Sequence, residues 1–251
     1  MTYAIPGSTP DGGGPIGETY GAAVVRVGDA SLVVDALRGI RFTGWVAPAD
    51  SGWVVALGDP GDGTVATGRS GVLEVGAALA AALHTVVVVA RVRLDRQLVL
   101  AAFRGADELG RYSSDPSQEP GADDAVVDEP YGVEHASAFA EAVGRADAAD
   151  ELADLLGEEL DPDSVYESER LARVLGLLGL PRWVVAAGAL PRDIPTGPRA
   201  KELIRLGAGS VGAKGAVQGR AAAAARRRMP PPPAIADPPR ADDPGIDPWL
   251  L

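Results

Sequence analysis

The segment from Ser70 to Ser113 constrains the fold most, because its hydrophobic period changes from helical to extended. Apolar residues first recur at helical spacing, at Val72, Val75, Leu79 and Leu83. Ser70 suits a helix N-cap, and we expect this helix to end near His84. Val86–Leu94 then forms a mostly apolar run of strand length, in which Arg91 and Arg93 alternate with apolar neighbours.

A returning strand is predicted at Gln97–Phe103, after a two-residue turn at Asp95–Arg96, and a third strand at Leu109–Ser113. Upstream, Ala22–Val27 and Trp53–Leu57 are apolar runs typical of strands, and Ser31–Gly39 has helical spacing. This order of elements predicts an α+β fold with a partly antiparallel sheet and packed helices.

Helical periodicity dominates after the sheet. One helix is predicted over residues 138–156 and a second over about 165–178, separated by Asp161–Ser164. The two helices resemble a hairpin, packed either on the sheet or on each other. Trp183–Ala187 is a buried strand or a short helix, and Ala200–Leu206 has a helical pattern.

The composition divides the chain into five parts. We expect a flexible N-terminus at 1–20, an α+β domain at 21–113, an acidic linker at 114–130 and a helical subdomain at 131–206. Residues 207–251, rich in Gly, Ala, Arg and Pro, predict a disordered tail.

Several compositional features indicate the compartment. There is no cysteine, so disulfides and thiolate chemistry are excluded, and a reducing compartment fits. The N-terminal residues lack the pattern of a secretory signal. The longest apolar stretch, Val75–Ala90, is shorter than the ~20 residues of a membrane helix. We therefore expect a cytoplasmic protein without a membrane span.

Charge is unevenly distributed along the chain. Residues 107–170 hold 20 of the 35 acidic residues and only three basic ones, whereas residues 199–228 hold eight basic residues and one acid. The overall net charge is −12. Such a distribution bears on partners and solubility rather than on the fold.

Two patterns resemble binding motifs but fail their structural requirements. Residues 207–212 match G-x-G-x-x-G, yet a helical pattern precedes them and polyproline follows, so no dinucleotide site is predicted. Asp161 and Asp163, followed by Glu167 and Glu169, lack the glycine of an EF-hand loop. The better explanation is that Asp163, with Ser164, is a helix-cap residue and that Glu167 and Glu169 favour the positive end of the helix dipole.

The two histidines, His84 and His135, do not belong to a zinc or nucleophile motif. No catalytic, cofactor-binding or metal-binding residue is therefore predicted, and the sequence does not favour an enzyme. A carboxylate pair in a cleft between sheet and helices stays open as an alternative, because an acidic chain offers many pairs.

The basic tail carries a cluster at Arg226, Arg227 and Arg228. Nucleic-acid binding is disfavoured, because no aromatic residue lies nearby to stack on bases and the net charge would repel a polyanion. The cluster could contact a protein partner, fold back onto the acidic helices or stay solvated, and the sequence does not choose between these.

The chain ends in an apolar peptide, Trp249, Leu250 and Leu251, after a proline-rich spacer. This peptide has no local core to bury it, which favours a docking motif for a partner groove. The sequence thus predicts a non-enzymatic protein–protein interaction or accessory protein. The alternatives are an immunity-like or antitoxin-like inhibitor of a basic protein, and a small-molecule enzyme or ligand sensor. Partner, pathway and oligomeric state are not determined by the sequence.

Overall fold

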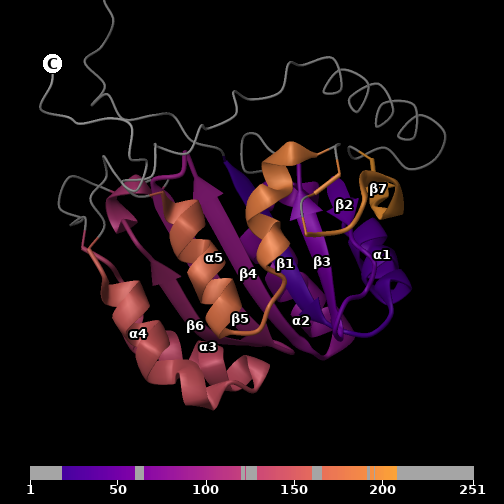
Figure 1. Cartoon of the computed structure of the whole chain (residues 1–251). Helices are drawn as coiled ribbons and strands as arrows, with labels where there is room; N and C mark the ends of the chain where they lie inside the picture. The colour runs from indigo at the N-terminus through magenta and orange to yellow at the C-terminus, as the bar shows by residue number, and fades with distance from the viewer. Residues whose placement is uncertain are drawn as a thin grey trace, which may run out of the picture.

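A seven-stranded antiparallel sheet forms the centre of the molecule (Figure 1). The computed structural model describes residues 19–59, 65–119, 122, 129–159, 166–190, 193–194 and 196–207. The strand order is β6-β5-β4-β1-β3-β2-β7, and every neighbouring pair is antiparallel. The strands are β1 (Tyr20–Arg26), β2 (Gly44–Val46), β3 (Trp53–Gly58), β4 (Val86–Arg93), β5 (Gln97–Arg104), β6 (Asp107–Ser113) and β7 (Ile204–Leu206).

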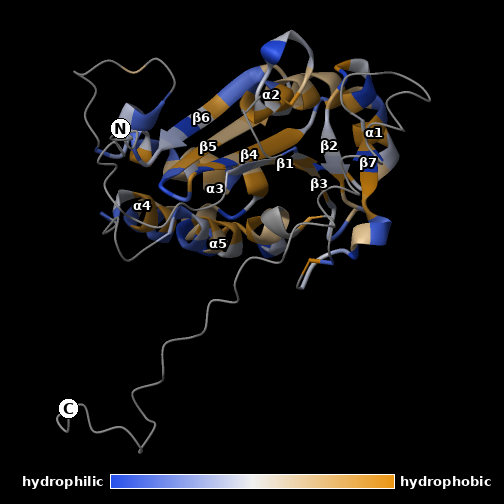
Figure 2. Cartoon of the chain, turned by 90° about the horizontal axis from the view of Figure 1, so that it is seen from above, coloured by the Kyte–Doolittle hydropathy of each residue, from blue (hydrophilic) through white to orange (hydrophobic). Residues whose placement is uncertain are grey.

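Both faces of the sheet are covered by helices, which makes a three-layer arrangement (Figure 2). Helices α1 (Ala30–Gly39) and α2 (Val72–Leu83) pack on one face. Helices α3 (Ala136–Val143), α4 (Ala149–Gly157) and α5 (Glu167–Leu177), with the 3₁₀ helix η5 (Arg182–Ala189), cover the other. The central strands are apolar almost throughout because both of their faces are buried. The predicted α+β class is confirmed.

Helix α2 lies close to the sheet because Gly76 faces β4. A Cβ atom at Gly76 would lie 2.1 Å from the Cγ2 atom of Val89, closer than two carbon atoms can approach. The backbone N–H of Gly71 donates to the Glu74 side chain (2.8 Å), which satisfies one free amide at the start of the helix. Ser70 therefore does not cap α2 as predicted, and its hydroxyl donates to the carbonyl of Thr67 instead.

The helices after the acidic linker pack both on one another and on the sheet. Side chains of α3, α4, α5 and η5 share one apolar cluster with the strands, including Phe139, Leu152, Leu171 and Trp183. The beginning of the predicted linker is also held against β4, where Arg91 forms an ion pair with Glu119 (2.8 Å). These contacts show that the helices pack against the sheet. The predicted domain boundaries stay a prediction.

The single helix predicted over residues 138–156 is wrong. It is divided into α3 and α4, because Gly144 ends α3 in the left-handed region at φ +81°. Its N–H donates to the carbonyls of Ala140 and Glu141, and the chain restarts through a 3₁₀ turn at Ala146–Ala148. Helical periodicity continues across such a break because both helices bury the same face.

Other differences concern short elements. The turn between β4 and β5 has three residues rather than two, since Leu94 and Asp95 both adopt positive φ and Arg93 pairs with Gln97. Residues 200–206 begin as a 3₁₀ turn and end as β7, not as a helix. Strand β2, which has only three residues, was not predicted. Among the described helices, none is both long and apolar enough to cross a bilayer.

Candidate functional site: the groove around helices α4 and α5

Helix α4 presents a charged face to solvent because its apolar residues all point inward. Leu152, Leu155 and Leu156 are buried. The exposed side carries acidic residues at Asp150, Glu151 and Asp154, which we call the acidic surface. Among the described residues, none of these three carboxylates has an ion-pair partner. This part of the molecule therefore presents negative charge that no ion pair among the described residues neutralises.

Helix α5 is positioned by a residue far away in sequence. Asp95, in the β4–β5 turn, accepts hydrogen bonds from the backbone N–H groups of Glu167 (3.1 Å) and Ser168 (2.7 Å). These are free amides of the first turn of α5, so Asp95 acts as its cap from outside the helix. Tyr20 and Ser168 add a hydroxyl–hydroxyl hydrogen bond of 2.8 Å.

Arg170 joins α5 to the end of α4. Its side chain is 2% exposed, and it donates to the carbonyl oxygens of Leu156 (3.3 Å) and Glu158 (2.5 Å). Carbonyls at a helix C-terminus lack partners within the helix, and a cation there also opposes the helix dipole. Arg170 thus fixes the C-terminus of α4 beside the N-terminal half of α5.

Two further buried polar groups surround Arg170. The Tyr112 hydroxyl accepts a hydrogen bond from Arg170 and donates to the carbonyl of Leu156 (2.9 Å). Burial raises the pKa of Tyr112 to about 12. Burial also raises the pKa of the Glu167 carboxyl above its usual range, although the Arg170 charge and a hydrogen bond with Ser114 act in the opposite direction. Arg170, Tyr112 and Glu167 together form a buried polar cluster beneath α4 and α5, which we call the support.

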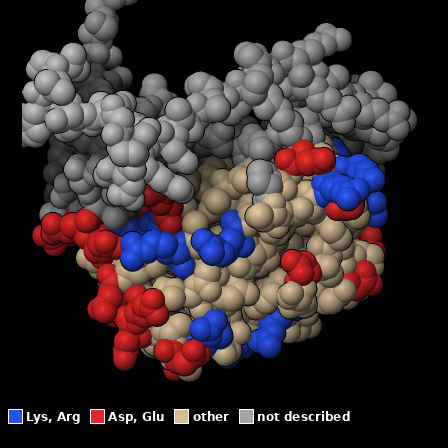
Figure 3. All heavy atoms as spheres, viewed as in Figure 1, with Lys and Arg blue, Asp and Glu red and all other residues tan. Residues whose placement is uncertain are grey.

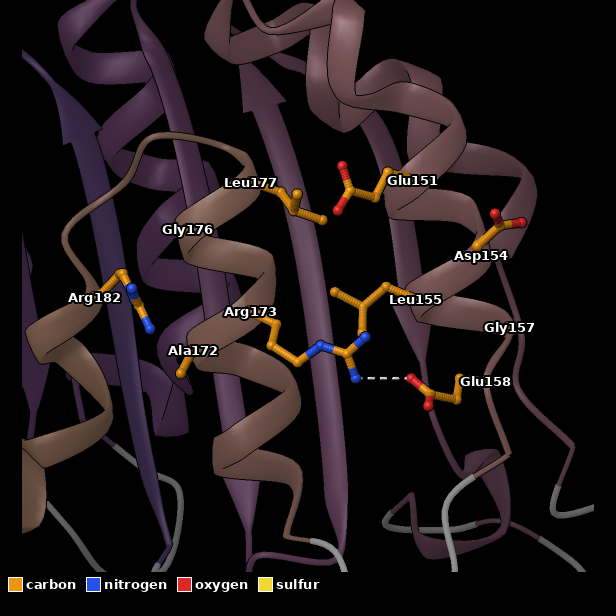
Figure 4. Close-up of a pocket in the computed structure, with 10 residues that line it drawn as sticks. All are labelled: Glu151, Asp154, Leu155, Gly157, Glu158, Ala172, Arg173, Gly176, Leu177 and Arg182. Atoms are coloured by element: carbon orange, nitrogen blue, oxygen red, sulfur yellow. Dashed lines mark hydrogen bonds and ion pairs between the residues drawn. The ribbon is translucent and has the colours of Figure 1, made fainter.

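Above this support lies an open groove of about 680 Å³, lined by α4, α5 and the first residue of η5. Ala172 and Gly176 on α5 have small side chains, which leave a depression in the surface of that helix. Leu155 and Leu177 project into the gap between the two helices, as Figure 4 shows. Arg173 reaches from α5 to Glu158, with 2.8 Å between Nη1 and Oε2 (Figure 4).

The two sides of the groove differ in charge. Glu151, Asp154 and Glu158 come from the α4 side, whereas Arg173 and Arg182 come from α5 and η5. Figure 3 shows acidic atoms gathered over the α4 side of this face and basic atoms nearer α5. Glu151 points into the gap and Asp154 lies on the outer side of α4 (Figure 4). The arrangement suits an elongated ligand with positive charge toward the α4 side, small apolar groups over Ala172 and Gly176, and no positive charge beside Arg173 and Arg182.

The predicted partner-binding residues Arg226, Arg227 and Arg228 lie outside the described residues, as do Trp249, Leu250 and Leu251. Their roles stay predictions. Of the G-x-G-x-x-G pattern only Gly207 is described, directly after β7.

The four acids considered for metal binding are not seen to form one site. Asp161 and Asp163 fall outside the described residues, Glu167 is buried beside Arg170, and Glu169 is exposed. Within the described parts of the chain, no group of three or more His, Asp or Glu side chains could hold a metal ion.

The histidines have local roles. His84 adopts the left-handed conformation at the C-terminus of α2, where its backbone N–H donates to the carbonyl of Ala80. The His135 Nδ1 atom lies 2.9 Å from the carbonyl oxygen of Arg111. The region between sheet and helices, where a carboxylate cleft was considered, is filled by the apolar cluster.

Comparison with known proteins gives no lead: no family model, no curated protein and no solved structure matches this chain.

The roles of Arg170, Arg173 and Arg182 were not predicted from the sequence. A signal for Arg170 was present, because Glu167 and Arg170 continue the buried i, i+3, i+4 face that Leu171 and Val174 belong to. Two opposite charges on an otherwise apolar helix face predict a buried pair. For Arg173 and Arg182 there was no such signal, since an exposed arginine on a helix is common.

Proposed function

We propose that this chain is a non-enzymatic protein–protein interaction or accessory protein that receives a basic segment of a partner protein on its acidic surface. The observation that carries the proposal is the position of Glu151 and Asp154. Both are exposed carboxylates without an ion-pair partner among the described residues. Glu151 points into a groove with apolar side chains at its centre, and Asp154 lies at the outer rim of that groove. Such a site combines charge steering with apolar burial.

The support beneath the groove favours recognition by a preformed surface. Arg170 and Asp95 fix α4 and α5 from below, through backbone groups at one end of each helix. A ligand that enters between two fixed helices does not require them to reorganise, which lowers the free-energy cost of binding. Residues 249–251 supply a second proposed contact, in which the apolar peptide docks in a groove of the partner.

Calorimetric titration of the full chain with an oligo-arginine peptide tests the acidic surface. The double variant Glu151→Gln/Asp154→Asn should bind the peptide about fivefold to tenfold more weakly, because each exposed pair contributes up to ~1 kcal/mol. The affinity should also fall when the salt concentration is raised from about 0.1 M to about 1 M, where the screening length shortens to about 3 Å.

The matched control is Asp35→Asn/Asp107→Asn, which removes the same charge from two exposed positions on α1 and β6. Its affinity should stay close to that of the unmodified chain. If both double variants weaken binding equally, the peptide responds only to net charge and the proposed surface is wrong.

A narrower version of the proposal is an immunity-like or antitoxin-like inhibitor of a basic protein. The same surface would then cover the partner's functional site, with fast association that depends strongly on salt. Inhibition of a basic nuclease or toxin in proportion to occupancy of the acidic surface would favour this version over an accessory role.

A further inference from the structure

The chain itself carries a segment whose chemistry matches the groove. After Gly207, the last described residue, residues 208–228 contain five basic residues and no acidic one. Residues 220–228 read RAAAAARRR, so a run of five alanines is flanked by arginines on both sides. Small apolar side chains between positive charges are what the groove and its acidic side would accept.

The strand register places the start of this segment at the same end of the molecule as the groove's α4 terminus. Leu206 pairs with Gly44, and Gly44 pairs with Gly58. Along the sheet, this is the end at which β1 begins with Tyr20, next to the β4–β5 turn that caps α5.

Glu158 lies at that end too, because Arg170 in the first turns of α5 holds its carbonyl oxygen. The chain therefore leaves the fold at the same end of the strands as the C-terminus of α4, although from the opposite edge of the sheet.

The length of chain is sufficient to reach the groove. Helix α5 contacts β4 and β5, and β5 lies five strand positions from β7. At about 4.8 Å per strand spacing this is about 24 Å. Arg220 is the thirteenth residue after Gly207, and an extended chain of thirteen steps spans up to about 43 Å. Residues 220–228 can thus lie over α5 without any change in the fold.

We propose that residues 220–228 of this chain dock in the groove around α4 and α5. The inference rests on the proposed function, because it uses the same acidic surface. The alanine run covers Ala172 and Gly176, where small side chains on both partners allow close packing. Arg226, Arg227 and Arg228 lie toward Glu151 and Asp154, away from Arg182 on the far side.

This docking gives the tail a regulatory role. A basic partner must displace residues 220–228 before it reaches the acidic surface, and the tethered segment competes at a high effective concentration. Only a partner that contacts more than the groove, or that also binds the tail, would overcome the competition. The tail therefore selects against weak, purely electrostatic binders.

Because the chain contains no cysteine, a single cysteine introduced by mutation can be labelled specifically in the full chain. A nitroxide label on Gly157→Cys reports which backbone amides lie near the groove, by paramagnetic broadening in NMR spectra. Gly157 is exposed, and a Cβ there would meet only the Cγ1 atom of Val133, at 3.8 Å. The control label is on Gly28→Cys, in the loop after β1, where a Cβ would meet nothing within 4 Å.

Amides of residues 220–228 should broaden with the label on Gly157→Cys and not with the label on Gly28→Cys. Raising the salt from about 0.1 M to about 1 M should remove the broadening. The charge reversal Glu151→Lys/Asp154→Lys should remove it as well, and the matched reversal Asp35→Lys/Asp107→Lys should leave it unchanged. Reversing Arg226, Arg227 and Arg228 to Glu in the Glu151→Lys/Asp154→Lys chain should restore it.

Equal broadening from both labels, or broadening that ignores reversal of the acidic surface, would overturn the docking of the tail. That result leaves the peptide titration untouched, so the two proposals fail separately. If docking in cis is correct, replacing Arg226, Arg227 and Arg228 by Gln should tighten binding of the oligo-arginine peptide. No change in that affinity would count against competition by the tail.

Discussion

Arg170 and Glu167 lie three residues apart on α5 and form a buried ion pair, with 3.5 Å between Nε and Oε2. Neither the Nε atom of Arg170 nor the Oε2 atom of Glu167 has a hydrogen-bond partner among the described residues, although both atoms are buried. The guanidinium instead directs its Nη atoms at Tyr112 and at the end of α4. One buried cation therefore serves an acid, a phenol and a helix terminus together.

Replacing Arg170 by Met should destabilise the protein by about 3–5 kcal/mol, because the Glu167 carboxylate and the α4 carbonyls lose their partner in a buried site. The measurement is urea unfolding at pH 7. Arg173→Met is the matched control, since its ion pair with Glu158 is exposed and should contribute less than about 1 kcal/mol. In the double variant Glu167→Met/Arg170→Met, part of the loss should be recovered. Additive losses would show that the two residues are not coupled.

The pH dependence of stability should carry the signature of Glu167. Burial raises its pKa in the folded protein, so the folded state binds its proton more tightly than the unfolded state. The associated stability is fully present below the unfolded pKa and is lost as pH rises through the raised folded value. Glu167→Gln removes this loss. Its unfolding free energy, relative to that of the unmodified chain, should therefore increase as the pH rises above about 4.5. A difference that stays constant with pH would contradict the assignment.

Close packing of α2 on β4 predicts that Gly76→Ala destabilises the protein. The added methyl group would lie 2.1 Å from Val89 Cγ2, so helix or strand must shift, at a cost of about 1–3 kcal/mol. Gly39→Ala is the control, because a Cβ at Gly39, at the end of α1, meets nothing within 4 Å. That substitution should stabilise the protein by up to about 1 kcal/mol. Unfolding of both variants in denaturant provides the comparison.

The proposed docking role of the C-terminal peptide predicts that Trp249→Ala leaves thermal stability nearly unchanged. Substitutions outside a core usually alter the free energy of unfolding by less than about 0.5 kcal/mol. Removal of a core tryptophan costs about 3–5 kcal/mol instead. Thermal unfolding followed by circular dichroism separates the two. A melting temperature lowered by many degrees would place Trp249 in the core and end the docking interpretation.

The sequence predicted the strands and helices whose burial is extensive. The elements of residues 72–104 were predicted correctly, because an amphipathic helical pattern followed by four consecutive valines has few other interpretations. Short elements were missed, since β2 and β7 have three residues each and carry no period. Periodicity also could not show that Gly144 ends a helix, because the apolar face continues on both sides of it.

The groove was less accessible to sequence reasoning than the fold. The acidic residues of α4 were counted, but their meaning depends on which residues lie opposite, and Arg173 and Glu158 meet only after two helices are placed side by side. The role of Asp95 also depends on a contact between residues distant in sequence. It was assigned to a turn, and the structure shows that it caps a helix more than seventy residues away.

The pairing of β7 with β2 has a consequence for biosynthesis. Arg205 donates to the carbonyl of Gly44 (2.8 Å) across 161 residues of sequence. At about 5–20 residues per second, β2 emerges from the ribosome about 8–30 s before the strand that covers it. The nascent chain thus exposes an open sheet edge for most of its synthesis, and a chaperone or another copy could pair with that edge before β7 arrives.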